Sequence, residues 1–254
     1  MRTIEQKEKE HYDFFYETKK ERDVYFPSMT CRRFQVRQAF KLLDIEKKDL
    51  TILDVGCGIG AKSIYLNGFY KKYVGIDLSE GMIKVAREFC KNIKNAHFMV
   101  SNVKEMKSLN IPPPDVVLID GALHHMTELN IVFDQIRSIV KPGTLLIAIE
   151  PQSANKAIQL LRYLRMKIDK SYSKNQIFFS EMQLRDILME NKLREAKFFY
   201  TGFITPVFAQ VPLRPEIIFR PTASLAIKLE KILYKILKGP FKKLSWNIVA
   251  IARF

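Results

Sequence analysis

Ile52-Leu53-Asp54-Val55-Gly56-Cys57-Gly58-Ile59-Gly60 is the stretch of sequence that decides the fold of this chain. It runs from an apolar segment, through three closely spaced glycines, toward a segment with helical character. Glycines let the chain turn sharply and let a ligand lie directly against the backbone. Gly56, Gly58 and Ala61 also satisfy the loose G-x-G-x-x-G/A pattern of nicotinamide and flavin nucleotide sites, so those cofactors have to be considered.

Four short, nearly all-apolar runs occur in the first 150 residues: one leads into this loop and three follow it. Their composition is typical of strands buried on both faces of a parallel sheet. The runs are Thr51–Val55, Tyr73–Ile76, Asp115–Ile119 and Thr144–Ile149, with a weaker one at His97–Val100. The segments between them have helical spacing: Ala61–Asn67, Glu80–Lys91 and Glu128–Val140. Strands that alternate with helices predict right-handed crossovers between parallel strands. We therefore expect a doubly wound, Rossmann-like α/β fold.

The later part of the chain completes this fold. Ser180–Asn191 has the spacing of a helix with Ser180 as its N-cap, and Ala196–Ile204 and Asn247–Ala252 have the composition of two closing strands. The predicted sheet is thus seven-stranded and mostly parallel, with helices on both faces and an antiparallel last strand.

Additional helical pieces surround the predicted sheet. Arg2–Leu43 is expected to be helical, so residues 1–50 would form an N-terminal segment that packs on the domain spanning 51–254. Two insertions, at about 151–179 and 206–244, are not required by the sheet. Because they follow its carboxyl edge, where ligands bind in such folds, we expect them to form helical caps on the substrate side.

The chain is strongly basic. Its 254 residues carry a formal net charge of +15, which raises the expectation of a polyanionic neighbour: RNA, DNA or an anionic membrane surface. Cys31, Cys57 and Cys90 match neither a disulfide framework nor a zinc site, so we expect a reducing compartment and no metal. The charged N-terminus does not resemble a secretory signal, and no run approaches the roughly 18 apolar residues of a membrane span. These features predict a cytoplasmic protein, either soluble or peripherally attached to a membrane.

Asp54 distinguishes between the cofactors that the glycine loop could bind. A carboxylate beside the loop would repel a pyrophosphate but suits a ligand that carries an ammonium group and no phosphate, such as S-adenosylmethionine. Asp77 follows at the end of the next strand, where a carboxylate can bind both hydroxyls of an adenosine ribose. The alternative for Asp77 is a structural role at the start of the following helix. A dehydrogenase is disfavoured because of Asp54.

Five ordered motifs resemble those of class I S-adenosylmethionine-dependent methyltransferases, and of the methyltransferase type 11-like domain in particular. They are Leu53–Gly60, Val74–Ser79 with Met82, Ser101–Asn102, Asp115–Met126 and Val140–Thr144. The resemblance is close over Thr51–Glu150 and looser over Ser180–Ile204 and Trp246–Phe254. It implies a methyltransferase that binds S-adenosyl-L-methionine and releases S-adenosyl-L-homocysteine.

The same resemblance implies a set of cofactor-binding residues: Asp54, Gly56, Cys57, Gly58, Gly60, Asp77, Leu78, Met82, Asn102, Val103, Asp120 and Gly121. In this set Asp77 would hold the ribose. Asn102, where the family usually has Asp, would face the adenine amino group through its carbonyl oxygen. Asp120 and Gly121 would line the methyl-bearing end of the cofactor.

The catalytic residues are less determined, because methyl transfer depends mainly on holding nucleophile and methyl at near-attack distance. A general base is needed only when the acceptor must lose a proton. His125 and His124 follow the fourth strand on the expected cofactor side, and Glu150 ends the fifth strand. We take His125 as the first candidate base, with His124 and Glu150 behind it; structural roles for all three remain open.

The second insertion has the pattern of an amphipathic helix with two stripes. Its apolar residues are Leu225, Leu229, Ile232, Leu233, Ile236 and Leu237, and its lysines are Lys228, Lys231, Lys235 and Lys238, followed by Lys242 and Lys243. Such a helix suits an anionic membrane surface, so a peripheral membrane contact through 225–243 is one expectation. The alternative is a cap helix whose apolar face covers the core.

The acceptor class stays open between hypotheses. A small-molecule or lipid-like acceptor is the first, because the chain has neither the Asn/Asp-Pro-Pro-aromatic motif of base-amino methylation nor the cysteine pair of cytosine-carbon methylation. An RNA methyltransferase, favoured by the positive charge, is the second. A cofactor-binding protein without catalysis is the third.

Overall fold

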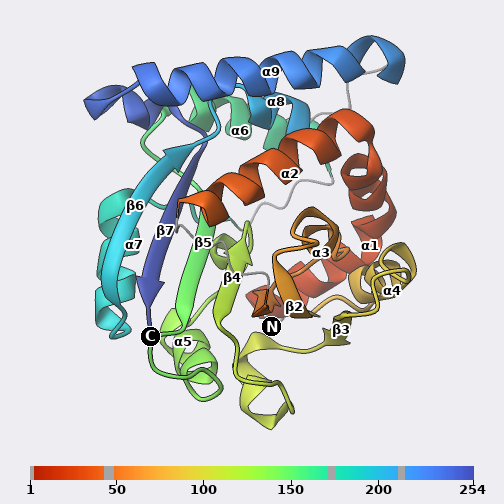
Figure 1. Ribbon diagram of the computed structural model, residues 1–254, viewed down its shortest axis with the longest axis vertical. Helices are drawn as coiled ribbons and strands as arrows, with labels where there is room; N and C mark the ends of the chain where they lie inside the picture. Colours follow the sequence, from red (N-terminus) through yellow and green to blue (C-terminus); the bar gives the residue numbers. More distant parts are fainter. Residues whose placement is uncertain (1–2, 43–48, 171–175, 211–214) are drawn as a thin grey trace.

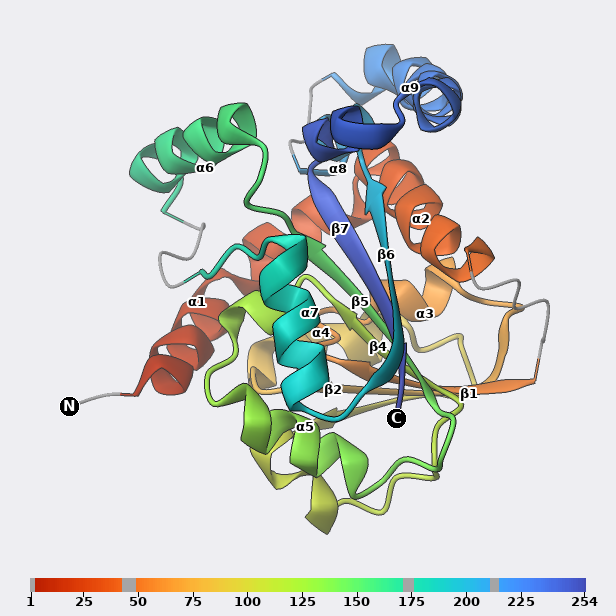
Figure 2. The same cartoon turned by 90° about the vertical axis from the view of Figure 1, so that its left-hand side faces the viewer.

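A computed structural model describes residues 3–42, 49–170, 176–210 and 215–254 (Figure 1). A central sheet runs through the molecule with helices on both sides, as the two views in Figures 1 and 2 show. The ends of the predicted N-terminal helical segment, Arg2 and Leu43, lie outside the described residues.

The sheet has seven strands in the order β3-β2-β1-β4-β5-β7-β6. The strands are β1 (Leu50–Val55), β2 (Tyr70–Asp77), β3 (Ala96–Val100), β4 (Val116–Asp120), β5 (Leu145–Pro151), β6 (Arg194–Thr201) and β7 (Asn247–Arg253). The first five pair in parallel, and β7 runs antiparallel to both of its neighbours. The predicted doubly wound fold, with its antiparallel last strand, is confirmed.

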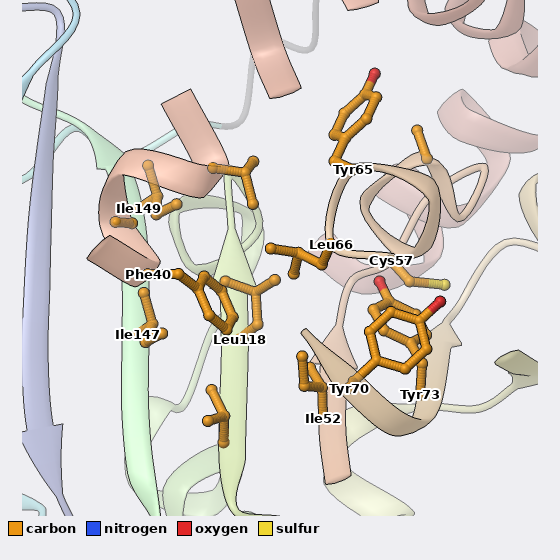
Figure 3. Packing of buried hydrophobic residues seen from close by; sticks show 14 of the residues in the cluster. Phe40, Ile52, Cys57, Tyr65, Leu66, Tyr70, Tyr73, Leu118, Ile147 and Ile149 are labelled. Carbon is orange, nitrogen blue, oxygen red and sulfur yellow. The ribbon is translucent and has the colours of Figure 1, made fainter. Parts of the chain in front are cut away.

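The two faces of the sheet are covered by different helices, and alternate strand residues enter two separate cores. In β1, Ile52 packs on one side and Leu53 on the other. The Ile52 side is closed by α2 (Phe26–Lys41), α3 (Ala61–Tyr65) and α4 (Glu80–Phe89), and the Leu53 side by α5 (Leu129–Arg137) and α7 (Glu181–Glu190). Figure 3 shows Phe40 of α2 packed against Leu118 and Ile147 of neighbouring strands.

The N-terminal segment forms two helices, because the chain breaks at Tyr25 just before Pro27. Tyr25 is extended, with a ψ of 123°, and lies between α1 (Ile4–Val24) and α2. The residue before a helix-opening proline region cannot readily continue a preceding helix. As a result α1 leaves the line of α2 and crosses the carboxyl end of the sheet, where it contacts α4.

The remaining helices gather at one end of the molecule (Figure 2). They are α6 (Lys156–Ile168), α8 (Thr205–Gln210) and α9 (Glu216–Ile236), with a short 3-10 helix at Gly239–Leu244. The helix α9 packs on α2 through the buried Ala223 and Ala226. In the described parts of the chain, no helix is long and apolar enough to cross a membrane.

Candidate cofactor and acceptor site

A cavity of about 590 Å³ opens at the carboxyl ends of β1, β2 and β4. This volume lies within the range of small-molecule sites, roughly 300–1,000 Å³. Most of the residues predicted to bind the cofactor line it: Gly56, Cys57, Gly58, Asp77, Leu78, Met82, Asn102, Val103, Asp120 and Gly121. Segments distant in sequence therefore meet at the place that the parallel strands predict.

The glycine loop needs glycine for two separate reasons. Gly56 has a φ of +72°, and a Cβ there would lie 2.4 Å from the Cβ of Ala122, so only glycine fits under the β4 loop. Gly58 has a φ of +55° and open space where a Cβ would be. The bare backbone at Gly58 thus faces the cavity, as a close-lying ligand requires.

Asp77 holds the loop and faces the cavity at the same time. Its Oδ2 accepts a hydrogen bond from the Gly58 backbone N–H at 2.8 Å, and its Oδ1 accepts one from the Ser79 N–H at 3.0 Å. Burial raises the pKa of Asp77, while these backbone donors oppose that rise. Each carboxylate oxygen can accept more than one hydrogen bond, so the Asp77 carboxylate can also receive two ribose hydroxyls.

Asp54 does not reach the cavity itself. Its carboxylate is fully buried, accepts a hydrogen bond from the Tyr73 hydroxyl and lies 3.3 Å from Lys62 Nζ. Burial raises the pKa of Asp54 to about 6, and the Lys62 charge opposes the rise. Lys62 lines the cavity, and Nζ also donates to the Gly56 carbonyl at 3.4 Å. Lys62 was not among the predicted site residues, yet it lies between Asp54 and any ligand in the cavity.

The adenine end of the predicted site is closed by the 3-10 helix η1 (Val103–Ser108). Asn102 caps it, since its Oδ1 accepts a hydrogen bond from the Lys104 N–H at 3.0 Å. Lys104 Nζ lies 2.6 Å from Glu5 of α1 and also pairs with Glu128. Although burial acts in the opposite direction, the Lys104 and Thr127 contacts lower the pKa of Glu5 to about 2. This ion pair fastens α1 across the cavity.

A second fastening lies at Asp13 of α1. Its Oδ1 accepts hydrogen bonds from the Ser79 hydroxyl at 2.5 Å and from the Gly81 N–H at 3.0 Å. Lys9 joins the same contact, because its Nζ lies 2.9 Å from Asp13 and 3.3 Å from Glu80. Helix α1 is therefore tied to the start of α4, directly beside Asp77.

Two histidines after β4 line the cavity, and each has a different partner. His125 Nε2 is 2.9 Å from the Tyr12 hydroxyl, and its Nδ1 is 3.0 Å from Glu8 Oε2. Burial and the neighbouring His124 lower the pKa of His125 to about 4. His124 Nδ1 lies 2.6 Å from Glu150.

Glu150 is fully buried at the end of β5 and is absent from the cavity lining. Besides His124, its carboxylate accepts the backbone N–H groups of Ala122, at 3.2 Å, and Leu123, at 2.9 Å. Burial raises the pKa of Glu150 to about 7. Glu150 therefore stands behind His124, on the side away from the cavity.

Comparison with known proteins agrees with this geometry. Residues 46–196, more than half of the chain, match the sequence model of a family described as a methyltransferase domain. The chain belongs to this methyltransferase family. The S-adenosylmethionine cofactor of class I methyltransferases fits the cavity, since Gly58 offers bare backbone and Asp77 a carboxylate at the end of β2.

Individual relatives of this methyltransferase differ in what they act on. It is 27% identical over 150 residues to a carboxy-S-adenosyl-L-methionine synthase of Helicobacter pylori, with 57% of this chain and 63% of that protein covered. It is 30% identical over 97 residues to an uncharacterized RNA methyltransferase of Chlamydia caviae, covering 34% of this chain and 24% of that protein. The chain thus spans less than two thirds of the length of these curated relatives.

Among solved structures, the methyltransferase resembles a Thermotoga maritima S-adenosylmethionine-dependent methyltransferase described as a possible histamine N-methyltransferase. The TM-score is 0.64 with 16% sequence identity, over 96% of this chain and 98% of the other. At this identity the likeness concerns the fold alone. It extends over the N-terminal helices and the caps as well as the sheet.

The methyltransferase cavity also contains residues that the sequence argument did not select. They come from three separate helices, and include Tyr12, Arg22, Arg32, Lys62 and Tyr65. Only Lys62 and Tyr65 are near a recognisable motif, a few residues after the glycine loop. No sequence signal brings Arg22 and Arg32 to the cavity, because that depends on the break at Tyr25. Of the predicted site residues, Asp54, Gly60 and Glu150 are absent from the lining.

Proposed function

We propose that this methyltransferase transfers the methyl group of S-adenosylmethionine to a small-molecule or lipid-like acceptor with apolar surface. The observation that carries the proposal is the apolar rim of the cavity. Leu161 of α6 and Val207 of α8 both line the cavity, yet they are 52% and 40% exposed, so they stand where the cavity meets solvent. An acceptor entering there first meets hydrocarbon, which favours an apolar molecule.

The cofactor is proposed to lie along the glycine loop and under α1. Asp77 would accept the ribose hydroxyls, and Leu78 and Met82 would flank the adenine, with Asn102 and Val103 at its edge. The methionine part would lie against Gly56, Cys57 and Gly58. Lys62, held by Asp54, would meet its carboxylate, because an ammonium group at that place complements an anion. Asp120 and Gly121 would then lie at the methyl-bearing end.

Bound S-adenosylmethionine supplies a methyl group that is already activated on a sulfonium. The protein has to orient the acceptor, exclude water and, for an acceptor hydroxyl or ammonium, remove a proton. We propose His124 as the group that takes this proton. Glu150 holds Nδ1 of its ring, which makes Nε2 the proton-accepting nitrogen.

His125 suits a supporting role better than the role of base. Its Nε2 pairs with the Tyr12 hydroxyl, Glu8 lies 3.0 Å from its Nδ1, and its pKa near 4 makes it a weak proton acceptor. We infer that the His125–Tyr12 contact holds α1 closed beside the reacting atoms.

We further propose that the protein meets an anionic membrane through α9. Its apolar stripe is exposed rather than turned to the core: Leu225 is 55% exposed and Ile236 66%. The lysine stripe runs beside it, with Lys228, Lys231 and Lys235 all exposed. Helix α6, at the same end of the molecule, exposes Leu160, Leu164 and Ile168. An apolar stripe flanked by lysines is the pattern of helices that lie in a membrane interface.

RNA is the second candidate acceptor. The net charge of +15 and the relative named as an RNA methyltransferase favour it. Leu161 and Val207 at the mouth of the cavity favour the apolar acceptor instead, although basic side chains and Trp246 also line the cavity.

Methyl-labelled S-adenosylmethionine distinguishes these acceptors. The purified protein is incubated with labelled cofactor and a cell extract, and the products are partitioned between organic, small-molecule aqueous and RNA fractions. We expect label in the organic or small-molecule fraction, and at least about a hundredfold slower labelling with the His124→Ala protein. Label confined to RNA would overturn the proposed acceptor class while leaving the methyltransferase activity in place.

A further inference from the structure

A cluster of two arginines and one aspartate lies in the cavity wall beside the cofactor site. Arg22 lies in the last turn of α1 and Arg32 in the second turn of α2, on either side of the break at Tyr25. Asp23 Oδ1 is 2.9 Å from Arg22 Nε and 3.4 Å from Arg32 Nε. The side chains are only 16% and 22% exposed, so a single carboxylate oxygen balances two largely buried guanidinium groups.

The hydrogen bonds of both arginines use only part of each guanidinium group. Arg22 donates a hydrogen bond to Asp23 through Nε, whereas Arg32 donates through Nε to the Ala209 carbonyl at 3.1 Å and is only ion-paired with Asp23. Within the described residues, neither arginine has a hydrogen bond from its terminal Nη nitrogens. Those Nη groups are the pair of donors that binds a carboxylate or phosphate in the two-pronged arrangement typical of arginine.

Tyr65 provides an independent sign of a missing partner at the same wall. Its hydroxyl is buried without a hydrogen-bond partner, although the residue is 2% exposed and lines the cavity. In Figure 3 this hydroxyl points away from the neighbouring Tyr70 and Tyr73. Burial raises the pKa of Tyr65, so the group is a neutral O–H donor. A buried donor without an acceptor destabilises the protein, and a bound acceptor atom would relieve this cost.

The cluster is close to the place of methyl transfer in the proposed function. Asp120, at the end of β4, is near enough to Arg32 for the arginine charge to oppose the rise that burial produces in the pKa of Asp120. The charges of Arg32 and Arg22 likewise oppose the rise that burial produces in the pKa of Tyr65. All three residues line the cavity, and Arg32 donates to the carbonyl of Ala209 in α8, the helix that carries Val207.

We propose that Arg22, Arg32 and Tyr65 form a subsite for an oxyanion, a carboxylate or phosphate, carried by the methyl acceptor. This inference rests on the proposed function, and it narrows the acceptor to an anionic molecule with an apolar part. Asp23 lies against the Nε atoms of both guanidinium groups, which leaves their Nη donors for the acceptor's anion. The apolar part of the acceptor then extends toward Leu161 and Val207.

The single tryptophan of the chain, Trp246, lines the same cavity and reports on binding by its fluorescence. The probes are benzoate and phenyl phosphate, with benzamide as the uncharged counterpart, each titrated into protein saturated with S-adenosylhomocysteine. We expect one of the two anions to bind at least about tenfold more tightly than benzamide, the gain of a charge-assisted hydrogen bond. The anion that binds more tightly shows whether the acceptor carries a carboxylate or a phosphate.

Two variants and one control complete the experiment. Arg22→Gln should weaken binding of the preferred anion about tenfold or more, and Tyr65→Phe, which removes only a hydroxyl, about threefold. Both should bind S-adenosylhomocysteine as the wild type does. The matched control is Arg220→Gln, on the exposed side of α9 in an ion pair with Glu216, which should change neither affinity.

Equal binding of anions and benzamide would overturn the proposal. So would an Arg22→Gln protein that loses affinity for S-adenosylhomocysteine but keeps its affinity for the anion, because the arginines would then serve the cofactor carboxylate. A wild-type protein that is folded but does not bind S-adenosylhomocysteine would instead contradict the proposed function, and this inference with it.

Discussion

The Glu150 carboxylate lies 2.6 Å from Nδ1 of His124, and it is held there by the backbone N–H groups of Ala122 and Leu123. Above its pKa of about 7 the Glu150 carboxyl is ionised and can only accept, so the proton of the neutral imidazole then resides on Nδ1 and the lone pair on Nε2. Glu150, at the end of β5, thus sets the tautomer of His124, which follows β4. This arrangement underlies the proposed base.

Replacing His124 tests that role directly. His124→Ala should lower the methyl-transfer rate by about 10²–10⁴, the usual contribution of a general base, while the affinity for S-adenosylhomocysteine stays unchanged. His125→Ala is the matched control and should have the smaller effect on the rate. The rates follow from incorporation of labelled methyl into the extract fraction identified above. Equal losses in both variants would remove the distinction between the two histidines.

Glu150 should make stability depend on pH in a defined direction. Its pKa is about 7 in the folded chain against 4.5 ordinarily, so the native state binds the proton more tightly than the unfolded state. Its contribution to stability is therefore fully present below pH 4.5 and is lost as the pH rises through 7. Glu150→Gln does not titrate and keeps a carbonyl that can accept from Ala122 and Leu123. Thermal unfolding should show the variant gaining stability relative to wild type between pH 5 and pH 8; a constant difference would contradict the assignment.

The arrangement of the sheet could be predicted from sequence because each strand is a short apolar run followed by a chemical marker. Asp54 and Asp77 lie at the carboxyl ends of adjacent parallel strands, and the helix between these strands makes a right-handed crossover the expected connection. The prediction was less complete at Asp54. Nothing in the sequence around Asp54 indicates that Lys62, the second residue of α3, forms an ion pair with it inside the protein.

The long-range contacts of the N-terminal helices were not predictable either. The pattern of α9 shows an apolar stripe, but not that Ala223 and Ala226 would pack on α2 and leave that stripe exposed. Likewise, Arg22 and Arg32 are ordinary helix residues until the break at Tyr25 turns both toward Asp23. Both outcomes depend on packing between elements far apart in the chain, and the local periodicity of a sequence does not indicate such packing.

The hydrogen bonds that hold α1 against the start of α4 should control the rate at which the cofactor dissociates. Asp13→Ala removes the acceptor for Ser79 and Gly81, and hydrogen bonds to a charged group are worth about 1.5–3 kcal/mol. We expect S-adenosylhomocysteine to dissociate about tenfold faster or more in stopped-flow displacement. Asp134→Ala, which removes an exposed ion pair with Arg137 on α5, is the control and should dissociate as the wild type does. Unchanged dissociation from Asp13→Ala would mean that α1 does not close the site.

The membrane proposal predicts a loss of binding to anionic vesicles when the α9 lysines are reversed. Glutamate at Lys228, Lys231, Lys235 and Lys238 should release the protein in a vesicle co-sedimentation assay, because each lysine contributes about 1 kcal/mol near such a surface. Reversal of four lysines elsewhere is the matched control: Lys71, Lys72, Lys91 and Lys94, all exposed. If the wild-type protein does not bind anionic vesicles, the proposed membrane contact is ruled out.

Calorimetric titration of S-adenosylmethionine into wild-type and Asp77→Ala protein tests the central claim most directly, that the cavity at the ends of β1 and β2 is the cofactor site. We predict saturable, one-to-one binding by the wild type and none detectable by Asp77→Ala. Asp115→Ala serves as the control: this residue directly precedes β4, at the amino ends of the parallel strands and outside the cavity lining, and the variant should bind as the wild type does. Tight binding by a folded Asp77→Ala protein, or no binding by the wild type, would contradict the account.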